Sequence, residues 1–363
     1  MKPSKVCNQK GSVLIIVLWT SVLLTVLVTA MAGKVRLSAQ TVLHNQQASA
    51  SWATLMGAVS HAEMELMLSL MSQPIDFQPE LTAEGEERLP AYRFNGQPLQ
   101  LHYPIPEDVV VRIYDHAGKI NLNRIPRRFM QMLIEERLGG IEEADPEQVQ
   151  ELLAAWTDWT DLNDLEGLNG AESEYYETLD PPYEPRNNAD LDTVEEILHI
   201  KGFAELFEGV NLEAAFTIYG NDRTINLNLA TREAMALLPG MNEELIENII
   251  AFREIEDISN RTEIAEIIPF ENLQEMSAWL GNNTSPFYSV YVYPRSELDP
   301  ETLARLEESL EFVNPDPVTQ AYMEIIEVRS YRDLPRVFKI DPYGVLPDTA
   351  PARVHPEDYL FPN

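Results

Sequence analysis

The chain has 363 residues and a formal net charge of −33 at pH 7, from 59 acidic and 26 basic side chains. Such a negative field repels nucleic-acid phosphates, which argues against a nucleic-acid-binding protein. The hydrophobic fraction of 45% excludes a disordered chain. The length predicts two to three domains. The only cysteine, Cys7, rules out an intramolecular disulfide.

The N-terminal segment differs from the rest in charge and hydropathy. The first 36 residues contain no acidic residue and five basic ones, which are Lys2, Lys5, Lys10, Lys34 and Arg36. Residues 12–33 are uncharged and mostly apolar, and a helix rising ~1.5 Å per residue would let them cross a bilayer. Because the basic side stays in the cytoplasm, everything after Gly33 is predicted to lie beyond the membrane.

Three kinds of processing fit this segment. A secretory signal would be cleaved after Ala30-Met31-Ala32, and an uncleaved anchor would keep the whole segment. The third is a prepilin-type leader, residues 1–11, cleaved between Gly11 and Ser12. The apolar run is longer than the core of an ordinary signal peptide, and the helical pattern continues past Ala32. Both features favour the leader.

Residues 34–72 predict an amphipathic continuation of the same helix. The segment contains no proline, and apolar residues recur on one face at helical spacing: Trp52, Leu55, Met56, Val59, Leu66 and Leu70. We expect this half of the helix to pack on a globular domain. One long helix, half in lipid and half on a domain, is the build of a pilin-like subunit.

One internal repeat lies in the body of the chain. Ile120-Asn121-Leu122-Asn123 recurs as Ile225-Asn226-Leu227-Asn228, 105 residues later. Each copy predicts a short strand, a turn and an Asn that caps the following helix. The expected helices are 126–138, 149–159, 193–199, 206–216, 231–238 and 244–253. The expected strands are 91–94, 99–103, 109–114, 288–293 and 321–328.

These elements predict an α+β fold with a small antiparallel sheet and a large all-helical insertion. The predicted division is a leader (1–11), a transmembrane segment (12–33), an amphipathic helix (34–72), pilin-like strands (73–120), a helical insertion (121–215), a second Asn-Leu-Asn unit with the remaining strands (216–340) and an irregular Pro-rich tail (341–363).

Four features together resemble the minor pseudopilin K family of type II secretion systems. They are Lys10-Gly11 before the apolar helix, the paired Asn-Leu-Asn segments, the acidic loop 156–172 and Leu237-Leu238-Pro239-Gly240. The resemblance implies a pilin-like sheet bearing a helical domain, calcium in that domain, and a place at the pseudopilus tip. Ile16 stands where most pseudopilins have Glu, and the K family also lacks that Glu. Ser12 is a less usual first mature residue than Met or Phe.

The acidic loop has the composition of a calcium site. Hard cations take six to eight oxygen ligands from closely spaced carboxylates and amides. The run begins at Asp158 and supplies the expected ligands Asp161, Asn163, Asp164 and Glu172, with Asn187 later in the insertion. The spacing is not that of an EF-hand, because Leu165 takes the fifth position and the glycine comes one residue late. A solvated acidic face is the alternative.

Leu237-Leu238-Pro239-Gly240-Met241 resembles a helix-hairpin-helix turn, and Ile200-Lys201-Gly202-Phe203 is a weaker second example. In DNA-binding proteins the amides of such a turn receive a phosphate. Glu243, Glu244 and Glu247 surround it here, so a packing module is favoured. No enzyme is expected, because the histidines are scattered and the chain lacks a phosphate loop, a nucleophile elbow and a mature thiol.

The predicted function is that of a minor pseudopilin at the pseudopilus tip, supporting protein secretion across the outer membrane. The resemblance implies a single-pass inner-membrane protein with a periplasmic C-terminal domain. Its implied partners are the I-type and J-type minor pseudopilins, the major pseudopilin and the prepilin peptidase. Two alternatives remain open: a minor pilin of a type IV pilus, and an exported calcium-binding periplasmic protein released by signal peptidase.

Overall fold

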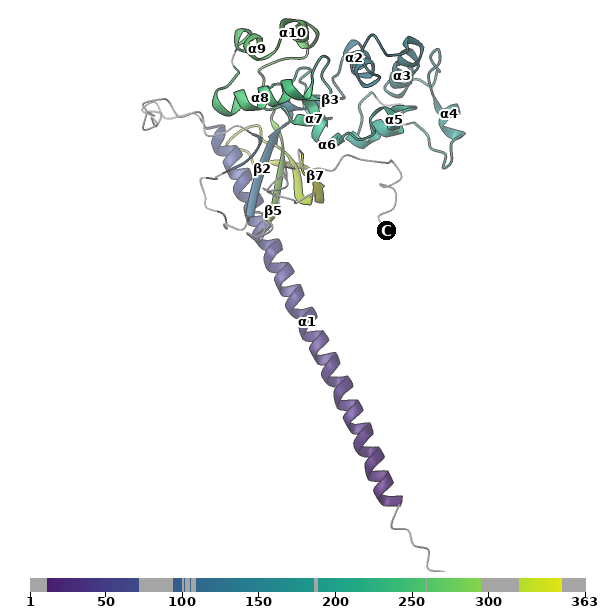
Figure 1. Cartoon of the computed structure of the whole chain (residues 1–363), viewed down its shortest axis with the longest axis vertical. Helices are drawn as coiled ribbons and strands as arrows, with labels where there is room; N and C mark the ends of the chain where they lie inside the picture. Colours follow the sequence, from purple (N-terminus) through teal and green to yellow (C-terminus); the bar gives the residue numbers. More distant parts are fainter. Residues whose placement is uncertain are drawn as a thin grey trace, which may run out of the picture. The chain divides into compact units, whose positions relative to one another are not determined.

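The computed structural model of the chain (Figure 1) describes residues 12–71, 94–99, 101, 105, 109–185, 189–258, 260–294 and 320–347. It contains two compact units, Met1–Met56 and Gly57–Asn363. The helix α1 (Ser12–Ser69) begins in the first unit and ends in the second. The predicted leader and most residues of the predicted strands 91–94 and 99–103 lie outside the described residues.

The first unit consists of the N-terminal part of α1. Its apolar side chains are exposed from Leu14 to Val28, and α1 has an 18-residue window with a mean hydropathy of 2.5. The hydroxyl groups of Thr25 and Thr29 donate hydrogen bonds to backbone carbonyls one turn earlier in the helix, so these polar groups are satisfied within α1. Among the described residues, α1 is the helix that is long and apolar enough to cross a membrane. The predicted continuity of one helix from residue 12 into the globular unit is confirmed.

The second unit contains a five-stranded antiparallel sheet. Its strands, in spatial order, are β1 (Asn95–Pro98), β2 (Val109–Asp115), β5 (Phe287–Pro294), β6 (Gln320–Glu327) and β7 (Arg336–Val345). Aromatic and β-branched residues fill β2 and β5, as expected of a strand that is buried on both faces. Val110, Tyr114, Tyr291 and Met323 form the core of one face.

The C-terminal turns of α1 cover the opposite face of the sheet. Ala58, Ala62 and Leu66 are buried at helical spacing. Glu63 of this segment shares a hydrogen bond with Glu324 of β6, whose neighbours Met323 and Ile325 belong to the core of the other face. Because side chains alternate across a strand, Glu324 and α1 lie on the second face.

A helical region is inserted between the adjacent strands β2 and β5. Its elements are η1 (His116–Gly118), β3 (Ile120–Asn121), α2 (Arg127–Arg137), α3 (Pro146–Trp159), α4 (Ser173–Glu177), η2 (Val194–His199), α5 (Phe203–Leu206), α6 (Leu212–Ala215), β4 (Phe216–Thr217), α7 (Arg232–Met235), α8 (Glu243–Ile255), α9 (Arg261–Ile267) and α10 (Phe270–Met276).

One hydrophobic cluster holds the helical region together. It contains buried residues from Ile120 to Trp279, and Phe129 of α2 stacks on Trp279 with ring centroids 4.5 Å apart. Residues on both sides of the predicted domain division between 215 and 216 belong to this cluster, Ala215 and Phe216 included.

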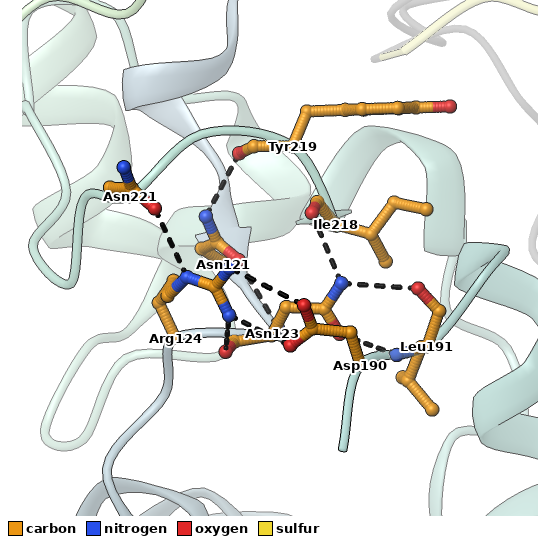
Figure 2. A network of polar contacts seen from close by, with 8 residues as sticks. All are labelled: Asn121, Asn123, Arg124, Asp190, Leu191, Ile218, Tyr219 and Asn221. Atoms are coloured by element: carbon orange, nitrogen blue, oxygen red, sulfur yellow. Dashed lines mark hydrogen bonds and ion pairs between the residues drawn. The ribbon is translucent and has the colours of Figure 1, made fainter. Parts of the chain in front are cut away.

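In both copies of the repeat, an Asn side chain forms a reciprocal pair of hydrogen bonds with the backbone of a distant residue. Asn123 donates its amide to Leu191 O (3.1 Å) and accepts a hydrogen bond from Leu191 N (2.7 Å), as Figure 2 shows. In the second copy, Asn228 makes the same reciprocal pair with Ile258 O (3.0 Å) and Ile258 N (2.9 Å). The prediction that these Asn residues cap helices was therefore wrong. Each instead bonds to the backbone of a distant loop. Helix α7, which follows the second copy, is capped by Thr231.

Figure 2 also shows how the first copy is tied to the chain beyond β4. Asn121 donates to Tyr219 O (2.8 Å), and Arg124 contacts Asn221 and the carboxylate of Asp190. Asn123 donates to Ile218 O as well (3.2 Å). The first copy therefore bonds directly to the segment that leads into the second copy.

A buried polar group joins the helical region to the sheet. The ring of His116 lies between Thr217 Oγ1 (2.7 Å) and Ser289 Oγ (2.8 Å). Lys119 Nζ donates to Glu213 O and Ser289 Oγ, and burial lowers the pKa of Lys119 to about 8. The side chains of His116 and Lys119 make these hydrogen bonds to other residues of the protein, so we assign this buried group a structural role.

Several elements differ between the prediction and the structure. Helix 231–238 is shortened to α7 (Arg232–Met235), and β1 (Asn95–Pro98) lies between the predicted strands 91–94 and 99–103. The expected helix 206–216 is split into α5 and α6 because Gly209 adopts a positive φ of 78° and Asn211 caps a new helix. Residues 194–199 form the 3-10 helix η2. Strand β7 was not predicted, and it extends beyond residue 340, where the irregular tail was expected to begin.

Candidate functional site

The acidic loop after α3 brings three carboxylates together. Oxygens of Asp158, Asp161 and Glu172 all lie within 4.8 Å of one another. Asp158 comes from the last turn of α3, Asp161 follows that helix directly, and Glu172 is the N-cap residue of α4. The loop therefore folds back so that two helix ends share one acidic cluster.

Two glycines allow the loop to close on Asp158. Asp158 Oδ2 accepts hydrogen bonds from Gly167 N and Ala171 N, each 3.0 Å long. A Cβ atom on Gly170 would lie 1.8 Å from Asp158 Oδ2, and one on Gly167 would lie 2.8 Å from Oδ1. Any larger residue at these positions would push the loop away from the carboxylate.

Short-range hydrogen bonds shape the rest of the loop. Asp161 Oδ1 accepts from Asn163 N (2.9 Å), and Asn163 Oδ1 accepts from Leu165 N (3.0 Å). Asp164 Oδ1 accepts from Ser173 N in the first turn of α4 (3.3 Å). The bonds of Asp161 and Asn163 are Asx turns, and each of the two aspartates uses one carboxylate oxygen in these bonds.

Glu172 is the unusual member of the cluster. The residue is 4% exposed, and neither oxygen of its buried carboxylate has a hydrogen-bond partner among the described residues. Burial, followed by the charges of Asp158, Asp161, Asp164 and Glu166, raises the pKa of Glu172 to about 7. A buried carboxylate without a donor is costly unless a cation balances it.

The donor set fits a hard divalent cation. Calcium binds oxygen ligands at about 2.3–2.6 Å, so ligands on opposite sides of one ion are roughly 5 Å apart. The separations within this cluster satisfy that limit. The cluster offers carboxylate oxygens without thiols or imidazoles, which favours calcium over transition metals.

The structure places the five predicted ligands differently. Asp161 and Glu172 belong to the cluster, whereas Asn163 and Asp164 lie in the same loop with one side-chain oxygen bonded to a backbone amide. Asn187 lies outside the described residues. The predicted set omitted Asp158, and a sequence signal existed: it occupies the apolar face of α3 beside Trp156 and Trp159.

The second candidate site is the N-terminal helix. Gly11 lies outside the described residues, and Ser12, the predicted first mature residue, is the first residue of α1 that the structure describes. Ile16 is 61% exposed and presents no carboxylate. The apolar surface around it is suited to lipid and to the helices of neighbouring subunits.

Known proteins share features with this chain. Residues 118–207, which include the acidic cluster, match the family model described as type II secretion system (T2SS), protein K. A chain in the crystal structure of the GspK-GspI-GspJ complex from the enterotoxigenic Escherichia coli type 2 secretion system is similar, with 12% identity and a TM-score of 0.46. The similarity covers 82% of this chain and 98% of that chain. None of the curated proteins compared matches the chain.

Proposed function

We propose that this chain, whose residues 118–207 match the protein K family, is a minor pseudopilin of a type II secretion system. The family match supports this assignment, and the apolar helix α1 supplies the membrane segment that a pseudopilin needs. The protein acts as a structural subunit that supports export across the outer membrane. It would act through helix packing and through its shape, and we assign it no catalytic step.

The proposed location is the inner membrane, with residues 1–11 cytoplasmic and the second unit periplasmic. The charge distribution supports this orientation, because the basic residues precede the apolar run and the acidic ones follow it. We propose that prepilin peptidase cleaves after Gly11 and that the mature chain begins at Ser12.

The proposed place is the pseudopilus tip. The I-type and J-type minor pseudopilins are the proposed partners, and these are the two chains named beside GspK in the complex from Escherichia coli. Ile16 offers no carboxylate to the terminal amine of a neighbour, as expected of a subunit with nothing stacked above it. The inserted helical region, from α2 to α10, is too large to repeat along a narrow fibre of which the major pseudopilin forms the shaft.

We propose calcium as a structural ligand of the acidic loop. Asp158, Asp161 and Glu172 would bind it directly, with Asp164 and Asn163 near enough in sequence to add oxygens. The ion would neutralise the buried carboxylate of Glu172 and fix α4 against α3. The observation that most strongly supports this proposal is that the carboxylate of Glu172 is buried with no hydrogen-bond donor among the described residues.

The turn at Leu237–Met241 is proposed to be a helix-hairpin-helix packing module. It joins α7 to α8, Gly240 has a positive φ of 70°, and Met241 N bonds to Leu238 O (3.1 Å). Ile200 to Phe203 repeats this turn, with Gly202 at φ 79°. Leu237 and Leu238 are buried, Glu243 and Glu247 beside them are both paired with Arg232, and the protein as a whole is strongly acidic. Nucleic acid is therefore not a proposed ligand.

Substitution of Gly11 by Leu tests the proposed function at its first step. Prepilin-type processing requires the small residue at the cleavage point, so the variant should remain a full-length precursor in the membrane fraction. The N-terminal peptide of the unmodified protein, measured by mass spectrometry, should begin at Ser12. Normal maturation of the Gly11 variant, together with a block by Ala32→Leu, would instead indicate a conventional signal peptide.

A further inference from the structure

The outer edge of strand β7 has no partner strand among the described residues. The sheet ends at β7, which bonds along its inner edge to β6, and within the described part of the chain no strand lies beyond it (Figure 1). At ten residues it is the longest strand described, whereas β1 at the other edge has four. A long free edge presents a row of backbone donors and acceptors that another strand can pair with.

Both faces of β7 are also exposed. Val337 is 44% exposed, Ile340 56% and Tyr343 72%, and Leu334 just before the strand is 87% exposed. Natural edge strands are usually shortened, covered or blocked by charged residues pointing inward. Apolar side chains on a long free edge are instead typical of a surface that binds a partner.

The edge carries two exposed arginines in an otherwise acidic protein. Residues 329–343 contain two acidic and four basic side chains, whereas the chain carries a net charge of −33. Lys339 is neutralised by Glu195 and Glu213 of the helical region, and Arg329 is paired with Glu327. Arg332 and Arg336 are exposed, and they stack on Tyr331 and Phe338 with guanidinium-to-centroid distances of 5.2 and 4.9 Å.

The stacking keeps both guanidinium groups beside the edge. A guanidinium on an aromatic ring loses little hydration and retains its in-plane donors for a carboxylate. Phe338 is itself held by Tyr219 and Phe287, with ring centroids 5.4 Å away in each case. The charged end of the edge is therefore built on an aromatic cluster that reaches the core.

We propose that the outer edge of β7 binds an extended acidic segment of a partner protein by strand addition. The segment would pair with the backbone between Arg336 and Ile340, place carboxylates on Arg332 and Arg336, and lay apolar side chains on Val337 and Ile340. Pro342 has no N–H and bounds the paired stretch. This proposal rests on the edge itself and is independent of the pseudopilin assignment.

Two other occupants fit less well. A second copy of the chain, pairing β7 with β7 about a two-fold axis, would bring the arginines of both edges together, and like charges opposite one another destabilise a sheet. The chain's own tail, residues 348–363, contains Pro351, Pro356 and Pro362, which remove backbone donors. Its three acidic side chains and one basic side chain give it a charge that suits the two arginines, so its deletion is part of the test below.

Peptide binding to the full-length protein in detergent micelles tests the proposal. The probes are two fluorescein-labelled ten-residue peptides, one alternating Glu with Val and the other alternating Lys with Val. Fluorescence anisotropy should show the Glu peptide binding at least about tenfold more tightly at low salt. N-methylation of every second amide of the Glu peptide should abolish binding, because strand addition needs those donors.

The variant Arg332→Glu/Arg336→Glu should reverse the preference between the two peptides. Its matched control is Arg128→Glu/Arg223→Glu, which makes the same charge change at two exposed arginines elsewhere and should leave the preference unchanged. Melting curves of both variants report whether they fold.

Equal affinity for both peptides, or a preference that survives reversal of Arg332 and Arg336, would overturn the proposal. A Glu peptide that binds only after residues 348–363 are deleted would also overturn it, since the tail would then be the natural occupant of the edge.

Discussion

At the scale of single residues, the repeated asparagines and Glu172 affect the stability of the helical region in different ways. Asn123 and Asn228 satisfy backbone groups of distant loops, so their contribution is hydrogen bonding within the protein. Glu172 is buried among other carboxylates without a donor, so its burial costs free energy until a cation is present. Of these two arrangements, only the burial of Glu172 makes the free energy of unfolding depend on the cation concentration.

Calcium should stabilise the unmodified protein, whereas Glu172→Gln should remove most of that effect. A ligand that binds only the folded state at a hundredfold excess over its Kd adds ~2.7 kcal/mol to the free energy of unfolding. Without calcium, the variant should melt at a higher temperature than the unmodified protein, because burial of a charge among carboxylates is relieved. Thermal unfolding in chelator and in millimolar calcium measures both effects. Glu174→Gln, in the first turn of α4, is the control. A melting temperature of the unmodified protein that is indifferent to calcium would leave the loop as a solvated acidic face.

Asn228→Ala should lower the free energy of unfolding by about 2–3 kcal/mol, because Ile258 N and O both lose their partner. Asn221→Ala removes one exposed hydrogen bond to Arg124 and should cost less than about 1 kcal/mol. Denaturant unfolding of the two variants gives the comparison. Equal losses would contradict the role assigned to the repeat.

At the scale of elements, α1 meets the sheet through a pair of acidic side chains. Burial raises the pKa of Glu63, and the charge of Glu324 raises it further. Burial also raises the pKa of Glu324, although hydrogen bonds from Tyr322 and Glu63 oppose the change. The folded protein therefore retains protons on this pair that the unfolded chain has lost.

This pair should make the packing of α1 weaker as the pH rises. Both pKa values lie above 4.5, the ordinary value of a glutamate, so the folded state binds more protons above that pH than the unfolded chain does. The free energy of unfolding therefore falls as the pH rises through this interval. Glu63→Gln keeps a donor for Glu324 and removes the charge. Its free energy of unfolding, relative to the unmodified protein, should be greater at pH 7.5 than at pH 4.5. Glu271→Gln, at an exposed position, should show no such difference, and a pH-independent effect of Glu63→Gln would contradict the account.

The sequence predicted elements whose signals are local and missed those set by distant contacts. Helices α3 and α8 follow from apolar residues at helical spacing, and β5 follows from its aromatic and β-branched run. Strand β7 has no buried face, so Lys339, Asp341 and Pro342 hide any alternation. Asn228 has the short-range pattern of a helix cap, but the backbone of Ile258 is its actual partner. Composition alone does not distinguish the buried Asp158 from the exposed Asp164 and Glu166 that follow it, whereas its place on the apolar face of α3 does.

At the scale of the whole molecule, the chain combines a helix that is long and apolar enough to cross a membrane with an acidic globular unit that carries a helical insertion. The two units are suited to different surroundings, because the apolar side chains of the first are exposed and those of the second are largely buried. In the proposed pseudopilin, the helix would join the subunit to its neighbours, and the inserted region would give the tip its shape. Protein export should therefore depend on this chain.

The most direct test of this dependence compares the proteins of the culture medium and of the periplasm in cells with and without the gene. A defined set of proteins should move from the medium to the periplasm when the gene is deleted. The unmodified gene should restore their export, a Gly11→Leu gene should not, and surface pili should be unaffected. An unchanged medium, or loss of pili with normal export, would contradict the account.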